Sequence, residues 1–113
     1  MHEMSIALNI IDIASEAAEN AQSKKINEIE IEIGSISGVE IDALEFALDV
    51  AVQNTMLKDA SKKIIPIEAK AECLECHNTF PISFFYEPCP SCNSLNINIL
   101  QGKELRIKSI NIE

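Results

Sequence analysis

Apolar and polar residues alternate along this chain with a period that changes from segment to segment. Between Ser5 and Gln22 the apolar residues recur every three or four positions, with acidic residues on the remaining face. This spacing predicts an amphipathic helix whose inward stripe comprises Leu8, Ile11, Ser15 and Ala18. Ser5 is its expected N-cap, which leaves Met1–Met4 as a short extended arm.

A strict alternation of glutamate and isoleucine over Glu28–Ile33 predicts a strand with its isoleucines facing inward. A glycine-containing segment then interrupts the pattern, and Ser37 has capping-box spacing to Glu40. A second helix is therefore expected at about Glu40–Asn54. Its apolar stripe, with Phe46 beside it, is expected to pack in the core.

Three more strands are expected in the second half of the chain. The first is Lys62–Ala71, in which Pro66 marks a sheet edge or a bulge. Leu95–Leu100 and Lys103–Ile112 complete the set.

The last of these strands is expected to lie beside Glu28–Ile33. Its basic residues Arg106 and Lys108 share a parity and would form cross-strand pairs with two of the glutamates, Glu30 and Glu32. The apolar parity changes near Ser109, where a bulge or an end of pairing is expected.

Together these elements predict an α+β fold in which two helices pack on one face of a small, mostly antiparallel sheet. A four-cysteine zinc-ribbon hairpin is inserted between its strands. The expected division is an α+β domain of residues 1–70 plus 102–113 and a zinc-binding module of residues 71–101.

Four cysteines define that module. Cys73 and Cys76 form one Cys-x-x-Cys pair, and Cys89 and Cys92 form another after twelve intervening residues. Two such turns facing each other place four thiolates in a tetrahedron, the geometry of structural zinc sites. Four-thiolate iron is the main alternative. Two disulfides are not expected, because the start of the chain lacks the features of a secretory signal.

Charge narrows the classes of function. The net charge is −9, and residues 71–101 contain three acids and no lysine or arginine, which argues against nucleic-acid binding. No run of apolar residues is long enough to span a membrane. A cytoplasmic location is expected.

Four of the five aromatic residues lie between the cysteine pairs: Phe80, Phe84, Phe85 and Tyr86. A hairpin without another core would bury such rings over its metal site. An exposed apolar patch that binds a partner is the alternative.

Several motifs together resemble one family. They are the start Met1–Ser5, the segment Ile33–Val39, the paired cysteines with Cys89-Pro90-Ser91-Cys92, and the ending Gly102–Ile107. In these features the chain is similar to the HypA/HybF family of nickel chaperones for maturation of nickel–iron hydrogenases. The resemblance covers essentially the full length.

The resemblance implies a nickel metallochaperone with two metals. His2 matches the family's nickel-binding histidine with Glu3 beside it, and the four cysteines match its structural zinc ligands. Family members work with a hydrogenase-maturation GTPase to deliver nickel to the precursor of the hydrogenase large subunit, and some also serve urease with its accessory proteins. This chain departs at His77 and Asn93, where glycine is common. A left-handed backbone would suit asparagine better than histidine there.

The chemistry of the N-terminus agrees with this reading. The α-amine of Met1, the backbone nitrogen of His2 and its imidazole can close adjacent chelate rings around Ni(II), with Cu(II) as the stronger competitor. Glu3 is an auxiliary ligand that would offset the positive potential of a helix N-terminus.

Alternatives remain for the function, for the role of His77 and for the oligomeric state. The alternative function is a zinc-ribbon adaptor that binds proteins and no second metal. No arrangement typical of an enzyme is present, and a four-cysteine zinc leaves no position for water. His77 is either an exposed turn residue or an imidazole that replaces a thiolate when the pH falls or nickel binds. A monomer or a weak homodimer is expected.

Overall fold

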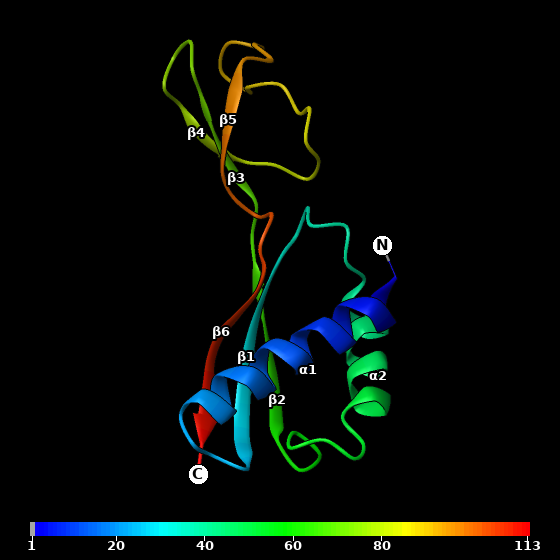
Figure 1. The fold of residues 1–113 in the computed structure, drawn as a ribbon. Helices are drawn as coiled ribbons and strands as arrows, with labels where there is room; N and C mark the ends of the chain where they lie inside the picture. The colour runs from blue at the N-terminus through cyan, green and yellow to red at the C-terminus, as the bar shows by residue number, and fades with distance from the viewer. Residues whose placement is uncertain (1) are drawn as a thin grey trace. The chain divides into compact units, whose positions relative to one another are not determined.

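The computed structural model describes residues 2–113, which divide into two compact units. The first unit comprises residues 2–32, Val39–Ile65 and Arg106–Glu113, and the second comprises Ile33–Gly38 and Pro66–Leu105. The elements along the chain (Figure 1) are α1 (Glu3–Asn20), β1 (Ile26–Gly34), α2 (Ile41–Ala51), β2 (Ser61–Ile67), β3 (Lys70–Cys73), β4 (Thr79–Pro81), β5 (Ile97–Gln101) and β6 (Leu105–Ile112).

The first unit is built on a three-stranded sheet with the order β2-β1-β6. α1 crosses this sheet, and α2 packs against α1 beside β2 (Figure 1). The isoleucines of β1 are buried, as their alternation predicts, and the α+β class with two helices is confirmed.

This sheet is mixed, because one of its two strand pairs is parallel and the other is antiparallel. Ile26 N–H donates to Met56 O ahead of β2, and further along both strands Lys63 Nζ lies 3.9 Å from Glu30 Oε2, so β1 and β2 are parallel. β6 runs antiparallel to β1, with Glu113 N–H bonded to Lys25 O at one end and an ion pair near the other.

Arg106 forms that ion pair, with its Nε 2.6 Å from Glu32 Oε1, as expected from its parity. The other predicted pair is wrong, because Glu30 accepts a hydrogen bond from Ser109 Oγ at 2.7 Å in place of a contact with Lys108. Lys108 and Ser109 are both exposed, so the inward–outward alternation shifts there while the strand continues to Ile112.

The expected start of the first helix is wrong. α1 begins at Glu3 with His2 as its N-cap, and Ile6 N–H already donates to His2 O at 3.2 Å. Burial explains the early start, because the inward stripe includes Ile6 and Ala7 in the first turns. Leu8, expected inside, is half exposed.

The second helix also differs at both ends. Its N-cap is Glu40, not the predicted Ser37, and Glu40 forms no side-chain cap hydrogen bond. The N–H of Ser37 donates to Gly34 O. The helix ends at Ala51, because Asn54 adopts φ 64° and Thr55 Oγ1 donates to the carbonyl of Val52 at 2.6 Å.

Phe46 does not pack in the core as expected. Its side chain on α2 is 72% exposed, because Leu44, Ala47 and Leu48 supply the buried stripe.

The second unit holds a three-stranded antiparallel sheet with the order β4-β3-β5. The single strand expected over residues 62–71 is in fact two strands in two sheets. At the break, Ala69 N–H donates to Ser35 Oγ and Glu68 O accepts from Gln101 Nε2, so side chains satisfy the backbone where strand pairing stops.

Two glycines allow a close backbone crossing in this unit. A Cβ on Gly34 would lie 1.9 Å from Gly102 O, and a Cβ on Gly102 would lie 2.3 Å from Ala69 Cβ. Gly102 also has φ 116°, a conformation that residues with a side chain rarely adopt.

We expect Gly102→Ala to destabilise the protein by about 2–5 kcal/mol, because backbone strain and a clash with Ala69 act together. Gly38→Ala is the matched control, since Gly38 also has positive φ (83°) but nothing lies within 4 Å of an added Cβ. Its expected cost is about 1–2 kcal/mol. Urea unfolding measures both, and equal losses would contradict the close crossing.

Candidate metal centre

The four cysteines come together in the second unit, as predicted. Cys73 ends β3, Cys76 lies in the turn that follows, and Cys89 and Cys92 lie in the connection from β4 to β5. Their sulfur atoms all lie within 4.8 Å of one another. Among residues 2–113, this is the one group of three or more His, Cys, Asp or Glu side chains placed to share an ion.

The two cysteine turns have the same backbone hydrogen bonds. Cys73 O accepts from His77 N–H at 2.8 Å, and Cys89 O accepts from Asn93 N–H at 2.7 Å. Both closing residues are left-handed, with φ 63° at His77 and 62° at Asn93. The expected left-handed positions are therefore confirmed. Each turn aims one buried and one exposed sulfur at a common point.

The sulfur separations suit a tetrahedral metal ion. Cys73 Sγ lies 3.5 Å from Cys92 Sγ, and Cys76 Sγ lies 3.7 Å from Cys89 Sγ. Four thiolates around zinc at about 2.3 Å would lie about 3.8 Å apart. All four cysteines are free of disulfides. The arrangement is a four-cysteine metal-binding site.

The thiols also differ in acidity. Burial disfavours ionisation of Cys89, but the N–H groups of Cys92 and Ser91 outweigh it and lower the pKa of Cys89 to about 6. The N–H of Ser94 favours ionisation of Cys92, yet Cys73 and the other neighbouring thiols, with burial, raise the pKa of Cys92 to about 12. Four thiolates this close repel one another, so a cation is needed to hold them together.

Three of the four aromatic rings do not cover this site. Phe80 is 4% exposed and packs in the small core of the unit, but Phe84, Phe85 and Tyr86 are exposed. The expected burial is wrong for these three because Phe80, Ile82, the two buried cysteines and a few small residues already fill that core.

The expected nickel residues lie in the first unit, at the start of α1. His2 is exposed, with the extended backbone of an N-cap (φ −86°, ψ 122°), and Glu3 is the acid of the first turn. Met1 lies outside the described residues, so its predicted role is not tested. His77 is exposed in the first cysteine turn, and its exchange with a thiolate stays a prediction.

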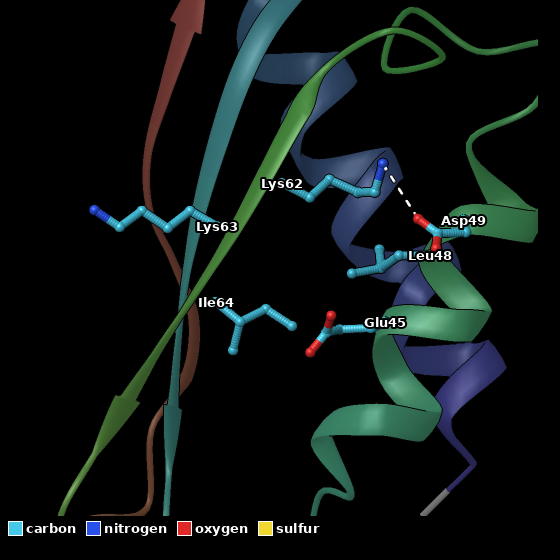
Figure 2. Close-up of a pocket in the computed structure, with 6 residues that line it drawn as sticks. All are labelled: Glu45, Leu48, Asp49, Lys62, Lys63 and Ile64. Atoms are coloured by element: carbon cyan, nitrogen blue, oxygen red, sulfur yellow. Dashed lines mark ion pairs between the residues drawn. The ribbon is translucent and has the colours of Figure 1, made fainter.

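Sequence reasoning missed a cavity of about 500 Å³ between α2 and β2 (Figure 2). Lys62 Nζ lies 3.4 Å from Asp49 Oδ1 across it, while Leu48 and Ile64 supply apolar wall and Glu45 a second acid. The lysine already neutralises Asp49, so this cavity is a poor cation site. The cavity forms between a helix and a strand that are separate in the sequence, so the hydrophobic periodicity of neither element predicts it.

In the described part of the chain, no helix combines the length and the apolar character required to cross a bilayer.

Comparison with known proteins gives a consistent result. A family model described as HypA, hydrogenase/urease nickel incorporation, metallochaperone, matches residues 1–112. The hydrogenase maturation factor HypA of Parabacteroides distasonis is 45% identical over 113 residues, covering 100% of this chain and 98% of that protein. Its counterpart in Chlorobium phaeobacteroides is 41% identical over 113 residues, with both chains covered completely.

Solved structures agree with the sequence matches. The solution structure of the nickel metallochaperone HypA from Helicobacter pylori is 30% identical and superposes with a TM-score of 0.72 over 99% of this chain and 97% of that one. A second solution structure of a HypA protein, also 30% identical, gives a TM-score of 0.74 over 100% and 97%.

Proposed function

Because the chain belongs to the HypA family of hydrogenase/urease nickel-incorporation metallochaperones, we propose that it binds Ni(II) at its N-terminus and delivers it to the precursor of a nickel–iron hydrogenase large subunit. The observation that carries this proposal is the family match over residues 1–112, which includes a histidine at position 2. Urease is the second nickel enzyme that the chain would serve.

The proposed nickel ligands are the α-amine of Met1, the backbone nitrogen and imidazole of His2, and Glu3 as an auxiliary oxygen ligand. The exposure of His2 supports this set, because its imidazole is free to turn toward an ion. Glu3 lies in the first turn of α1, where its charge opposes the positive potential of the helix end.

An open site with few ligands suits a carrier. If the protein enclosed the nickel ion, part of the fold would have to open before the ion could pass to another protein. Ligands at an exposed helix N-cap permit exchange with the ligands of an acceptor while the fold stays intact.

The four cysteines would hold Zn(II) as a structural ion. Their sulfur separations of 3.5 and 3.7 Å support tetrahedral coordination with no position left for water, and therefore no hydrolytic role. In this proposal, residues 1–70 plus 102–113 form the nickel-binding domain, residues 71–101 form the zinc-binding module, and the protein is not an enzyme.

The proposed partners are the hydrogenase-maturation GTPase, the large-subunit precursor and a urease accessory protein. The proposed location is the cytoplasm, where these maturation steps take place, and the proposed state is a monomer or a weak homodimer. The competing function is a zinc-ribbon adaptor without a second metal.

A nickel titration separates the two functions. The zinc-loaded protein, with its native N-terminus, is titrated with NiSO₄ and followed by isothermal calorimetry and by the d–d absorption of planar nitrogen-ligated nickel. We expect one equivalent of nickel per chain without release of zinc. If no nickel binds during the titration, or if nickel binds only by displacing zinc from the cysteines, the result would support the adaptor function.

A further inference from the structure

The four cysteines of the metal centre differ in their exposure to solvent. Cys73 and Cys89 are buried, whereas Cys76 and Cys92 are exposed. The first cysteine of each Cys-x-x-Cys turn is therefore held inside the unit, and the second lies at its surface. A solute that reacts with thiolates meets the second cysteine of each turn first.

Short sulfur contacts join each exposed cysteine to a buried cysteine of the opposite turn. Cys92 Sγ lies 3.5 Å from Cys73 Sγ, and Cys76 Sγ lies 3.7 Å from Cys89 Sγ. Sulfur atoms at these separations can bond to each other after a small movement of the turns. Each exposed thiolate thus has a second thiolate within reach on the other side of the metal centre.

Metal binding keeps these cysteines in the form that reacts with oxidants. The thiolate is the nucleophile of cysteine, and a cysteine that holds zinc has already lost its proton. Oxidation follows thiolate character together with access, so the exposed pair is the more susceptible one. A sulfenic acid that forms beside a second thiolate condenses with it to a disulfide, which is reversible.

The fold of the second unit depends on the same cysteines. Cys73 and Cys89 are two of the seven buried residues in its core cluster. A core of this size needs a metal ion to support it. Oxidation of the cysteines would therefore change the structure of this unit, while the helices and β1 keep a buried core of their own.

We propose that the metal centre is a redox switch, in which a peroxide joins an exposed cysteine to the buried cysteine opposite and so releases the bound zinc. The Cys92 thiolate attacks one peroxide oxygen, the O–O bond breaks, and hydroxide leaves. The Cys73 thiolate then attacks the sulfenic sulfur, a second hydroxide leaves, and a disulfide forms. Cys76 and Cys89 react in the same way. The peroxide gains the two electrons that each pair of thiolates loses.

The switch is reversible, because a thiol reductant returns two electrons to each disulfide and restores the four thiolates. Once one disulfide has formed, the two thiolates that remain are too few to hold zinc in a closed four-sulfur site. This inference rests on the zinc-binding part of the proposed function. It does not involve the proposed nickel ligands.

The test begins with zinc-loaded, full-length protein of measured zinc content. Hydrogen peroxide is added, and released zinc is followed with the chelating dye 4-(2-pyridylazo)resorcinol. Met4 is the internal reference, since its side chain is 40% exposed and its sulfoxide is measured by mass spectrometry. We expect zinc release to be complete before half of Met4 is oxidised. Dithiothreitol with added zinc should then restore the original zinc content and circular dichroism spectrum.

The disulfides are mapped after digestion without reductant by a protease that cleaves after glutamate. Cleavage after Glu75 and Glu87 separates Cys73, Cys76 and the second turn into three peptides. Disulfides that cross the metal centre link all three peptides, whereas disulfides within the turns leave the last peptide unlinked. We expect the linked set from zinc-loaded protein. Protein stripped of zinc before oxidation is the matched control, and it should give mainly disulfides within the turns, because nothing then holds the turns face to face.

The initial zinc content separates two kinds of failure. Protein that never contains zinc would contradict the zinc-binding part of the proposed function. Protein that keeps its zinc while Met4 is oxidised would contradict the switch alone. The switch is also contradicted by disulfides within the turns of zinc-loaded protein, by identical maps with and without zinc, by disulfides between chains, or by zinc loss that reductant and zinc do not reverse.

Discussion

Replacing Cys89 with serine is expected to remove the bound zinc and unfold the second unit, while α1, α2 and β1 keep their structure. The core of that unit comprises seven buried residues, two of which are cysteines: Ile36, Ala69, Ala71, Cys73, Phe80, Ile82 and Cys89. So few apolar side chains cannot stabilise a fold of this size without help. Structural zinc supplies about 10–16 kcal/mol of apparent binding free energy in small domains.

Zinc content by mass spectrometry and amide NMR spectra together measure this outcome. Ser91→Ala is the matched control, because Ser91 is exposed between two ligands of the same turn and its backbone N–H is unchanged by the substitution. The control should keep one zinc per chain and native spectra. A native β4-β3-β5 sheet in the Cys89→Ser protein, or an iron–thiolate absorption spectrum in the wild type, would contradict the assignment of structural zinc.

The second large effect is expected at position 2. His2→Ala should abolish specific nickel binding, since it removes the only imidazole at this end of the chain. The fold should be unchanged, because His2 is exposed and contributes its backbone carbonyl, not its side chain, to the first turn of α1. Nickel calorimetry at pH 7.5, with zinc content as the internal reference, measures the change.

Two companion variants separate the other proposed ligands. One glycine added before Met1 converts its amine to an amide and should weaken nickel binding at least tenfold. Glu3→Gln should weaken it less, because Glu3 is auxiliary. Normal binding by His2→Ala would mean that nickel lies elsewhere, and normal binding by the extended chain would remove the amine from the ligand set.

The metal site and the main strand were predictable because chemistry restricts them locally. Two Cys-x-x-Cys pairs have few uses besides a shared metal, and the alternation over Glu28–Ile33 admits one buried face. The pairing of Arg106 with Glu32 followed from parity and charge alone. Each of these inferences depends on residue types at fixed spacing, which the sequence states directly.

The remaining differences arise from tertiary context. Periodicity along Lys62–Ala71 does not reveal that the chain passes from one sheet to another, because both halves alternate with the same period. The parallel pairing of β1 with β2 depends on the helix between them, not on either strand. Four aromatic side chains that were expected to be buried are exposed, because other side chains already fill the cores: Phe46, Phe84, Phe85 and Tyr86.

The contribution of Ile36 to the second unit has a consequence for synthesis on the ribosome. Ile36 and Ser35 emerge well before Pro66–Leu105, yet Ile36 is buried in the same core and Ser35 Oγ accepts from Ala69 N–H. The nascent chain must therefore keep this early segment available until the cysteines have been translated. For the same reason a peptide limited to Pro66–Leu105, grafted into another protein as an autonomous finger, would bind metal with part of its core missing.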